Sequence, residues 1–171
     1  VSVKLQGVPL SPCRAKGDVI VRVSCSHPVA LEDALAAYAH PLGELHVEVE
    51  EPHEDVLQSY QDVAAVAEKF GEAMDAVRRL YPNCDTVHLF ASVPPALAVK
   101  MGAELSPTIH SPVQTYQFSS QTAPRYNPAL LVGERPRAPL TNSEIAQAAR
   151  GRAALADALA DLKLLVQEAE R

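Results

Sequence analysis

Residues 18–24 read DVIVRVS, and this stretch decides the class of fold. Apolar side chains stand at four of its seven positions, Val19, Ile20, Val21 and Val23, so a strand formed here is apolar on both faces. Such a strand is typical of the centre of a parallel sheet that helices cover on each side. We therefore expect an α/β domain in which this strand lies centrally in the sheet.

Two segments follow this strand. Pro28 is expected in the first turn of a helix that continues through VALEDALAAYA, where apolar residues recur at helical spacing. Residues 44–50 (ELHVEVE) alternate apolar and polar side chains, which predicts a strand with one wet face, nearer an edge of the sheet.

The strongest helix signal begins at Ser59. Ser59 and Asp62 have capping chemistry, apolar residues then recur every three or four positions as far as Leu80, and Pro82 with Asn83 ends the pattern. This segment is expected to form one long helix.

The remaining segments continue the alternation. The patterns predict strands at 86–91 (TVHLFA) and 112–118 (PVQTYQF), a helix at 95–104, and a short strand PALLV after the polar loop SSQTAPRYN. The order β-α-β-α-β-α-β indicates a Rossmann-like, mostly parallel sheet with helices on both faces and right-handed crossovers.

Three regions divide the chain. Residues 1–17 are expected to form an arm, an edge strand or a linker, and residues 18–140 the main unit. Residues 141–171 have a capping box at Thr141 and Glu144 and an apolar stripe, which predicts a C-terminal helix. This apolar stripe is expected to pack against another surface, either the sheet of the same domain or a partner helix in a dimer or filament.

Composition limits the partners. The 171 residues carry a net charge of −6, which argues against binding of duplex nucleic acid, whereas a ligand with a few phosphates could be held by backbone amides. No apolar run is long enough to cross a bilayer, and no secretory signal begins the chain. Three widely spaced cysteines suit neither a disulfide framework nor a zinc site. We expect a cytoplasmic protein that needs no membrane.

Motifs of known chemistry are missing from the sequence. It contains no GxGxxG or GxxxxGK[ST] phosphate loop, no GxSxG, HExxH or SxxK, and its six histidines are scattered singly. We therefore expect no cofactor, no metal site and no catalytic residues.

The polar loops are expected to meet at one place. In open parallel sheets, ligands bind beyond the carboxyl ends of the strands. In this chain those ends lead into residues 25–28, 51–58, 92–94 and 119–127, so a ligand site is expected there.

An ordered set of motifs resembles a known family. TVHLFASVPPALAVKMG, VQTYQF and RYNPALLV, preceded by DVIVRVSCSHPV and YPNCDTVHLF, resemble the SAVED domain over residues 18–132. That domain is the ligand sensor of CBASS antiphage effectors and is similar to the CARF domain of CRISPR ancillary proteins. The resemblance implies a CARF-like sensor of a cyclic di-, tri- or tetranucleotide that acts on a fused or associated effector in antiviral defence.

The resemblance also implies site residues. The nucleotide pocket would be bordered by Ser24, Ser26, His27, Ser92 and Pro94; Tyr116, Phe118 and Tyr126 would flank the bases, and Arg125 would meet phosphate. Other roles stay open. Ser24 and Ser92 also suit helix caps, Tyr116 and Phe118 suit core packing, and Arg125 suits a solvated surface. Tyr126, in a polar loop, is the preferred aromatic contact, and His88 is expected to be a satisfied core residue.

One departure from the family bears on assembly. A complete SAVED domain has two CARF-like halves, whereas this chain is expected to hold one. Either the chain is the second half of a longer effector, or it pairs with a copy of itself to build the pocket. The alternatives to a sensor are a small nucleotide-cleaving hydrolase on the same fold and a ligand-free assembly module.

Overall fold

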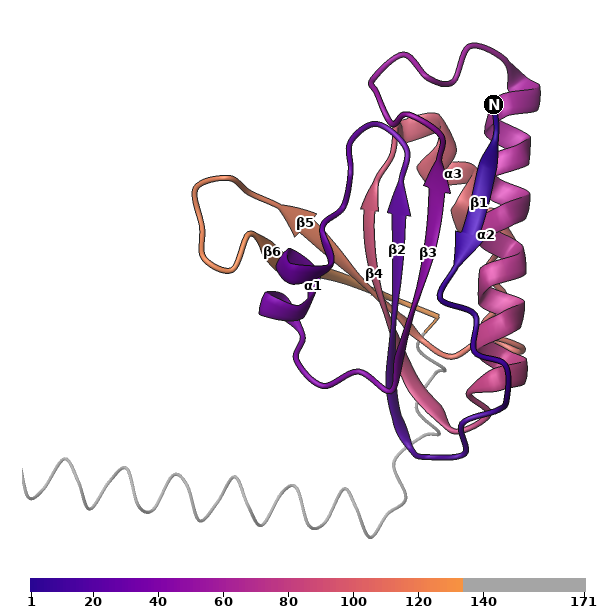
Figure 1. Ribbon diagram of the computed structural model, residues 1–171, viewed down its shortest axis with the longest axis vertical. Coiled ribbons are helices and arrows are strands. Elements are labelled where there is room, and N and C mark those ends of the chain that lie inside the picture. Colours follow the sequence, from indigo (N-terminus) through magenta and orange to yellow (C-terminus); the bar gives the residue numbers. More distant parts are fainter. Residues whose placement is uncertain (134–171) are drawn as a thin grey trace, which may run out of the picture. The chain divides into compact units, whose positions relative to one another are not determined.

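A six-stranded sheet forms the centre of the computed structural model, which describes residues 1–133 (Figure 1). The predicted C-terminal helix over 141–171 lies outside the described residues. The sheet order is β1-β3-β2-β4-β5-β6. The strands are β1 (Val3–Gln6), β2 (Gly17–Ser24), β3 (Gly43–Val49), β4 (Cys84–Ser92), β5 (Val113–Phe118) and β6 (Tyr126–Val132).

The four inner strands run parallel and both outer strands run antiparallel. β2 pairs in parallel with β3 and β4, and β4 pairs in parallel with β5, which confirms both the mostly parallel sheet and the central place of β2. β1 closes one edge by antiparallel pairing with β3, so part of the 1–17 region is an edge strand. β6 closes the other edge against β5.

Helices lie on both faces of the sheet, as predicted (Figure 1). α1 (Leu31–Ala37) packs on one face together with Ile20, Phe90 and Tyr126. α2 (Tyr60–Leu80) and α3 (Pro95–Glu104) pack on the other face. Within residues 1–133, the structure contains no helix that is both long enough and apolar enough to span a bilayer.

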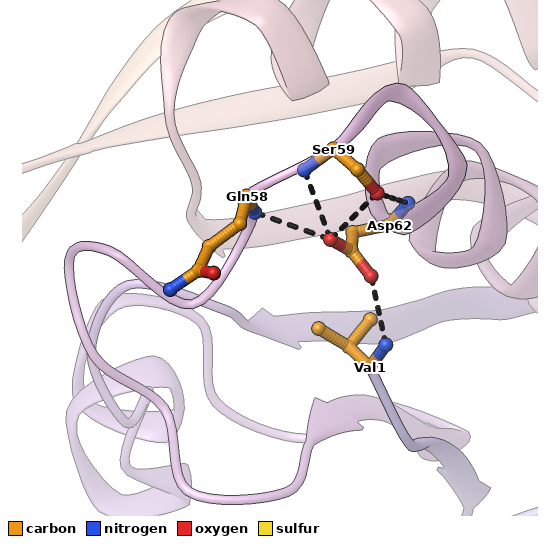
Figure 2. A network of polar contacts seen from close by, with 4 residues as sticks. All are labelled: Val1, Gln58, Ser59 and Asp62. Carbon is orange, nitrogen blue, oxygen red and sulfur yellow. Dashed lines mark hydrogen bonds and ion pairs between the residues drawn. The ribbon is translucent and has the colours of Figure 1, made fainter.

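The start of α2 confirms the predicted capping box. The Ser59 hydroxyl accepts from the Asp62 amide at 3.2 Å, and Asp62 Oδ2 accepts from the Ser59 amide at 3.0 Å (Figure 2). Asp62 Oδ1 also accepts from the amino group of Val1 at 2.8 Å. These hydrogen bonds, that from Val1 above all, lower the pKa of Asp62 to about 2. They connect the region before β1 to the first turn of α2.

The two faces of the sheet differ in chemistry. Val19, Val21 and Val23 of β2 belong to the large apolar core beneath α2 and α3. Alternate residues of the same strand face α1, where a small apolar cluster adjoins buried polar side chains. These polar residues are Arg22, Ser24, His46 and His88, each at most 9% exposed. The predicted wet face of β3 is therefore wrong at His46, which is buried.

α1 begins later than the sequence indicates. Pro28 is not in its first turn, since the helix starts at Leu31 with Ala30 as N-cap. The hydrogen-bonding groups of Val29 are engaged by side chains of β2, which holds this residue in the loop. The other predicted elements between residues 18 and 132 are present, with ends that differ by a few residues.

Candidate functional site

The carboxyl ends of β2 and β4 lie side by side, as the predicted site requires. Ser24 is in register with Ser92, and the amides of Cys25 and Ser26 both donate to the Ser92 carbonyl, at 3.1 and 2.9 Å. Ser24 is fully buried, whereas Ser26 and Ser92 are partly exposed. The structure therefore brings Ser24, Ser26 and Ser92 together at one edge of the sheet.

His27 and Pro94 extend this edge. His27 is exposed, and its Nε2 lies 3.8 Å from Glu54 Oε1, so the loop after β2 adjoins the loop after β3. Pro94 is the N-cap residue of α3 and Ala30 that of α1, and neither makes a side-chain cap bond. The alternative that Ser24 and Ser92 cap these helices is therefore wrong.

A buried polar group, here called the Val29 anchor, supports the loop after β2. It comprises Arg22 and Ser24 of β2 with Glu44 and His46 of β3. Ser24 Oγ accepts from the Val29 amide at 2.9 Å, and Arg22 Nη1 donates to the Val29 carbonyl. Glu44 Oε1 accepts from Arg22 Nε and Nη2 at 2.8 and 2.7 Å, and His46 Nε2 lies 2.8 Å from Ser24 Oγ. Both hydrogen-bonding groups of Val29 are thus held by side chains of β2, which are held in turn by Glu44 and His46 of β3.

Burial governs the electrostatics of this edge. Burial lowers the pKa of His46 from 6.5, and the charge of Arg22 lowers it further, against the opposing effects of Glu48 and Glu44. Burial also raises the pKa of the Cys25 thiol to about 11. A thiol with so high a pKa is a poor nucleophile at neutral pH.

An aromatic cluster covers the α1 face of β4, β5 and β6. Tyr116 stacks on Phe90 with ring centroids 4.2 Å apart, and Tyr126 meets Phe90 and Phe118 edge-on at 5.1 and 5.3 Å. Tyr126 is only 4% exposed, whereas Phe118 is 52% exposed. The expected loop position of Tyr126 is wrong, because Tyr126 is the first residue of β6 and its ring fills the cluster beneath α1.

Tyr116 also belongs to a polar chain that reaches the end of α1. Its hydroxyl lies 2.8 Å from His88 Nδ1, and His88 Nε2 lies 3.3 Å from Asp18 Oδ2. Tyr38, which stacks on His88 at 3.7 Å, donates its hydroxyl to the same Asp18 oxygen. Burial lowers the pKa of His88, and the hydrogen bond to Asp18 raises that of Tyr38 to about 12. The prediction that His88 is a satisfied core residue is confirmed.

Arg125 lies on the surface near the same helix. Its Nη1 is 3.4 Å from Asp33 Oδ2 of α1, and both side chains reach solvent. A pair this exposed contributes little to stability, so the guanidinium can exchange Asp33 for another anion at small cost.

The predicted residues therefore form two groups. The first comprises Ser24, Ser26, His27, Ser92 and Pro94; the second comprises Tyr116, Phe118, Arg125 and Tyr126. A constant register would place Ser92 beside Phe118, but the pairing of β4 with β5 ends at Leu89 and Thr115. Beyond that pair, β5 and β6 diverge from β4 (Figure 1).

Two polar cavities lie away from both groups. One, of about 420 Å³, is lined by Tyr81, Cys84 and Pro112 among others, at the amino ends of β4 and β5. The other, of about 560 Å³, lies between α2 and α3 and is lined by Gly71 and Glu104 among others. Neither is lined by a residue of the predicted site.

Sequence reasoning missed three residues of the Val29 anchor, namely Arg22, Glu44 and His46. A signal was present, since Arg22 is the one charge inside the apolar run VIVRV. A charged side chain in a strand covered on both faces must find a partner, because an unpaired buried charge is costly. Within residues 1–133, no cluster of three or more His, Cys, Asp or Glu side chains is placed to hold a metal ion.

Solved structures share the fold at low sequence identity. A SAVED/CARF-domain containing receptor, Cap4 of Acinetobacter baumannii, was solved with the cyclic trinucleotide 2′3′3′-cAAA and has a TM-score of 0.56 at 14% identity. The same receptor with 3′3′3′-cAAA gives 0.55 at 16% identity, and the structure described without a ligand gives 0.51 at 15%. Each match covers 75% of this chain and about a quarter of the receptor, 26%, 27% and 25% respectively. No curated protein matches the sequence.

A family model decides the relationship. The model of the SMODS-associated and fused to various effectors sensor domain, SAVED, matches residues 4–132. The match begins within β1 and ends with β6, so it covers the whole sheet. This chain therefore belongs to the SAVED family of sensor domains.

Proposed function

We propose that the chain senses a cyclic oligonucleotide at the carboxyl edge of its sheet and passes this event to an effector, in bacterial antiviral defence, without catalysing a reaction itself. The observation that carries the proposal is the SAVED family match over residues 4–132. Structures of the same fold that contain cyclic trinucleotides support the choice of ligand class.

The geometry of the edge supports this use. Ser26, His27 and Ser92 offer hydroxyl and imidazole groups beside the paired ends of β2 and β4, where a phosphate could accept hydrogen bonds. Exposed Phe118 offers a face for stacking on a base, and Arg125 offers an exposed cation. In this proposal the ligand is contacted by Ser26, His27, Ser92, Phe118 and Arg125. Pro94 and Tyr116 line the edge of the sheet beside it, and the buried side chains of Ser24 and Tyr126 hold this edge in place.

We further propose that a second surface completes the site. The chain spans about a quarter of the length of the Cap4 receptors that it matches. Its two groups of site residues are separated where β5 diverges from β4. The missing surface belongs to the rest of a longer chain or to another copy of this one, and self-association or effector fusion would supply it.

A thermal-shift panel tests the function. The 171-residue chain is heated with 3′3′3′-cAAA, with 2′3′3′-cAAA, and with linear ApApA or ATP as controls. A ligand present at 100 times its dissociation constant stabilises the folded state by about 2.7 kcal/mol, which raises the melting temperature by several degrees. We expect one cyclic nucleotide to do this and the linear controls to do much less.

Two other outcomes contradict the proposal. Rapid multiple-turnover cleavage of a cyclic nucleotide, followed by chromatography, would identify a hydrolase. An unchanged melting temperature with every cyclic nucleotide of a panel that varies ring size, base and linkage would favour an assembly module.

A further inference from the structure

The loop between β2 and α1 is held at its start by the Ser92 carbonyl, which accepts from the amides of Cys25 and Ser26, and at its end through the main chain of Val29. Ser24 Oγ accepts its N–H at 2.9 Å, and Arg22 Nη1 donates to its carbonyl oxygen. Ser24 and Arg22 are two residues apart on one strand, so both point to the same face of the sheet. Residues 25–28, which include Ser26 and His27, span the gap between this fixed point and the end of β2.

Each of the two side chains is held in turn by β3. Arg22 is in register with His46, and its guanidinium binds Glu44 through two nitrogens. Ser24 meets His46 Nε2 at 2.8 Å. Arg22 and His46 are 9% and 8% exposed and Ser24 is fully buried, so water cannot easily replace a lost partner.

The contact between Ser24 and His46 depends on the protonation of the imidazole. The Ser24 oxygen accepts from the Val29 amide, and the hydroxyl can donate its own hydrogen to His46 Nε2, 2.8 Å away, when that nitrogen carries no proton. In this arrangement His46 is neutral with its proton on Nδ1. A protonated His46 would direct a second donor at Ser24 Oγ, deprive the hydroxyl hydrogen of its acceptor, and place a second cation beside Arg22.

We infer that His46 is a positioning residue of the ligand site, which in its neutral form holds Ser24, and through it Val29, so that Ser26 and His27 face the ligand. This inference rests on the proposed function and adds regulation by pH to it. The charged groups that face His46 are Arg22 of β2 and Glu44 and Glu48 of β3, while Gln6 of β1 is its register partner. Protonation of His46 frees the loop, so ligand binding weakens as the medium is acidified.

The test compares three variants of the full chain by calorimetric titration with 3′3′3′-cAAA and 2′3′3′-cAAA at pH 7.5 and 5.5. The unmodified chain should bind more weakly at pH 5.5 than at pH 7.5, by less than the tenfold that an ordinary histidine would give, because burial lowers the pKa of His46. His46→Gln retains an acceptor near the position of Nε2 but cannot be charged, so it should bind normally at pH 7.5 and equally well at pH 5.5. His46→Leu removes the acceptor and should bind about tenfold more weakly at both pH values.

Tyr38→Phe is the matched control. It removes a partly buried hydrogen bond, that to Asp18, from the opposite end of α1 without touching Val29. It should lower the melting temperature about as much as His46→Leu does and leave affinity unchanged. Hydrogen exchange at the Val29 amide should accelerate in His46→Leu and not in Tyr38→Phe. The same measurement shows whether each variant is folded and which part of it has been loosened.

The outcomes separate the inference from the function on which it rests. If the unmodified chain binds and the pH dependence survives in His46→Gln, the dependence arises elsewhere and the inference is wrong. The inference is also wrong if Tyr38→Phe weakens binding as much as His46→Leu. If the unmodified chain binds neither trinucleotide at either pH, the proposed function fails for these ligands and the inference fails with it.

Discussion

Phe118 and Tyr126 touch each other, yet their exposures of 52% and 4% predict different effects of truncation. Phe118→Ala should weaken binding of a cyclic nucleotide about tenfold and barely change stability, because stacking of a base contributes about 1–3 kcal/mol. Tyr126→Ala should lower the free energy of unfolding by about 3 kcal/mol, because it empties a buried site beside Phe90. Calorimetric titration and urea unfolding measure the two effects.

The reverse result would reassign the ligand contact. Normal binding by a folded Phe118→Ala variant would exclude stacking at that position. Tyr126→Phe, which keeps the ring and loses only the hydroxyl, is the control for the core.

His88 should make stability depend on pH. Its pKa in the folded state lies below the ordinary 6.5, chiefly because it is buried. Above pH 6.5 both folded and unfolded chains hold it neutral; below 6.5 the unfolded chain binds a proton that the folded chain resists. The free energy of unfolding should therefore fall as pH drops through 6.5, by at most about 1.4 kcal/mol per pH unit for this group. The lowered pKa of His46 acts with the same sign.

Urea unfolding at several pH values between 5 and 8 measures this slope. His88→Gln should be less stable at every pH, since its stacking on Tyr38 is lost, but it should show a shallower slope. An unchanged slope in both His88→Gln and His46→Gln would mean that other groups control the acid sensitivity.

At the scale of elements, the capping box at the start of α2 can be tested alone. Ser59→Ala removes the acceptor for the Asp62 amide and should lower the free energy of unfolding by about 1 kcal/mol. Ser59→Thr retains the hydroxyl, which accepts from the Asp62 amide and donates to Asp62 Oδ2, and it should lose less, which makes it the matched control. Equal losses in the two variants would mean that Asp62 and its bond to Val1 maintain the end of the helix without Ser59.

The elements were predictable where one periodic signal dominated. β2, α2 and α3 followed from an apolar run, a capping box with helical spacing, and a proline at the start of a helix. The start of α1 was not predictable from Pro28, because the side chains of Arg22 and Ser24 hold the next residue out of the helix. Such contacts form between different segments of the chain, whereas helix propensity is read within one segment at a time.

For the candidate site, the sequence predicted which loops lie together better than it predicted which side chains are buried. Parallel strand order placed the loops after β2 and β4 together, and the structure joins them through Ser92. Burial was missed at His46, since alternation along one strand cannot show what covers its polar face, and at Tyr126, since this residue was expected in a polar loop and not in β6. The covering of that face by α1 and the loop before it depends on tertiary packing alone.

At the scale of the whole molecule, ligand should change assembly. The chain matches about a quarter of the Cap4 receptors, and we propose that a second surface completes its site. If another copy supplies that surface, a cyclic nucleotide should shift the chain toward a dimer or larger species, because a ligand shared by two copies stabilises their contact. Light scattering with and without 3′3′3′-cAAA measures the shift. A ligand-bound monomer at all concentrations would leave the second surface to the rest of a longer chain.

The Val29 anchor acts on main-chain atoms, and this bears on how such sensors diverge during evolution. The hydrogen bonds of the anchor reach the main chain of Val29 and not the side chains of Ser26, His27 and Pro28. Under the proposed function, replacement of these three residues would therefore alter which bases or linkages are accepted, while the anchor still holds Val29. Homologues should accordingly vary in specificity at positions 26–28 and retain compatible pairs at 22 with 44 and at 24 with 46. New ligand preferences would then arise by few substitutions, without a new fold.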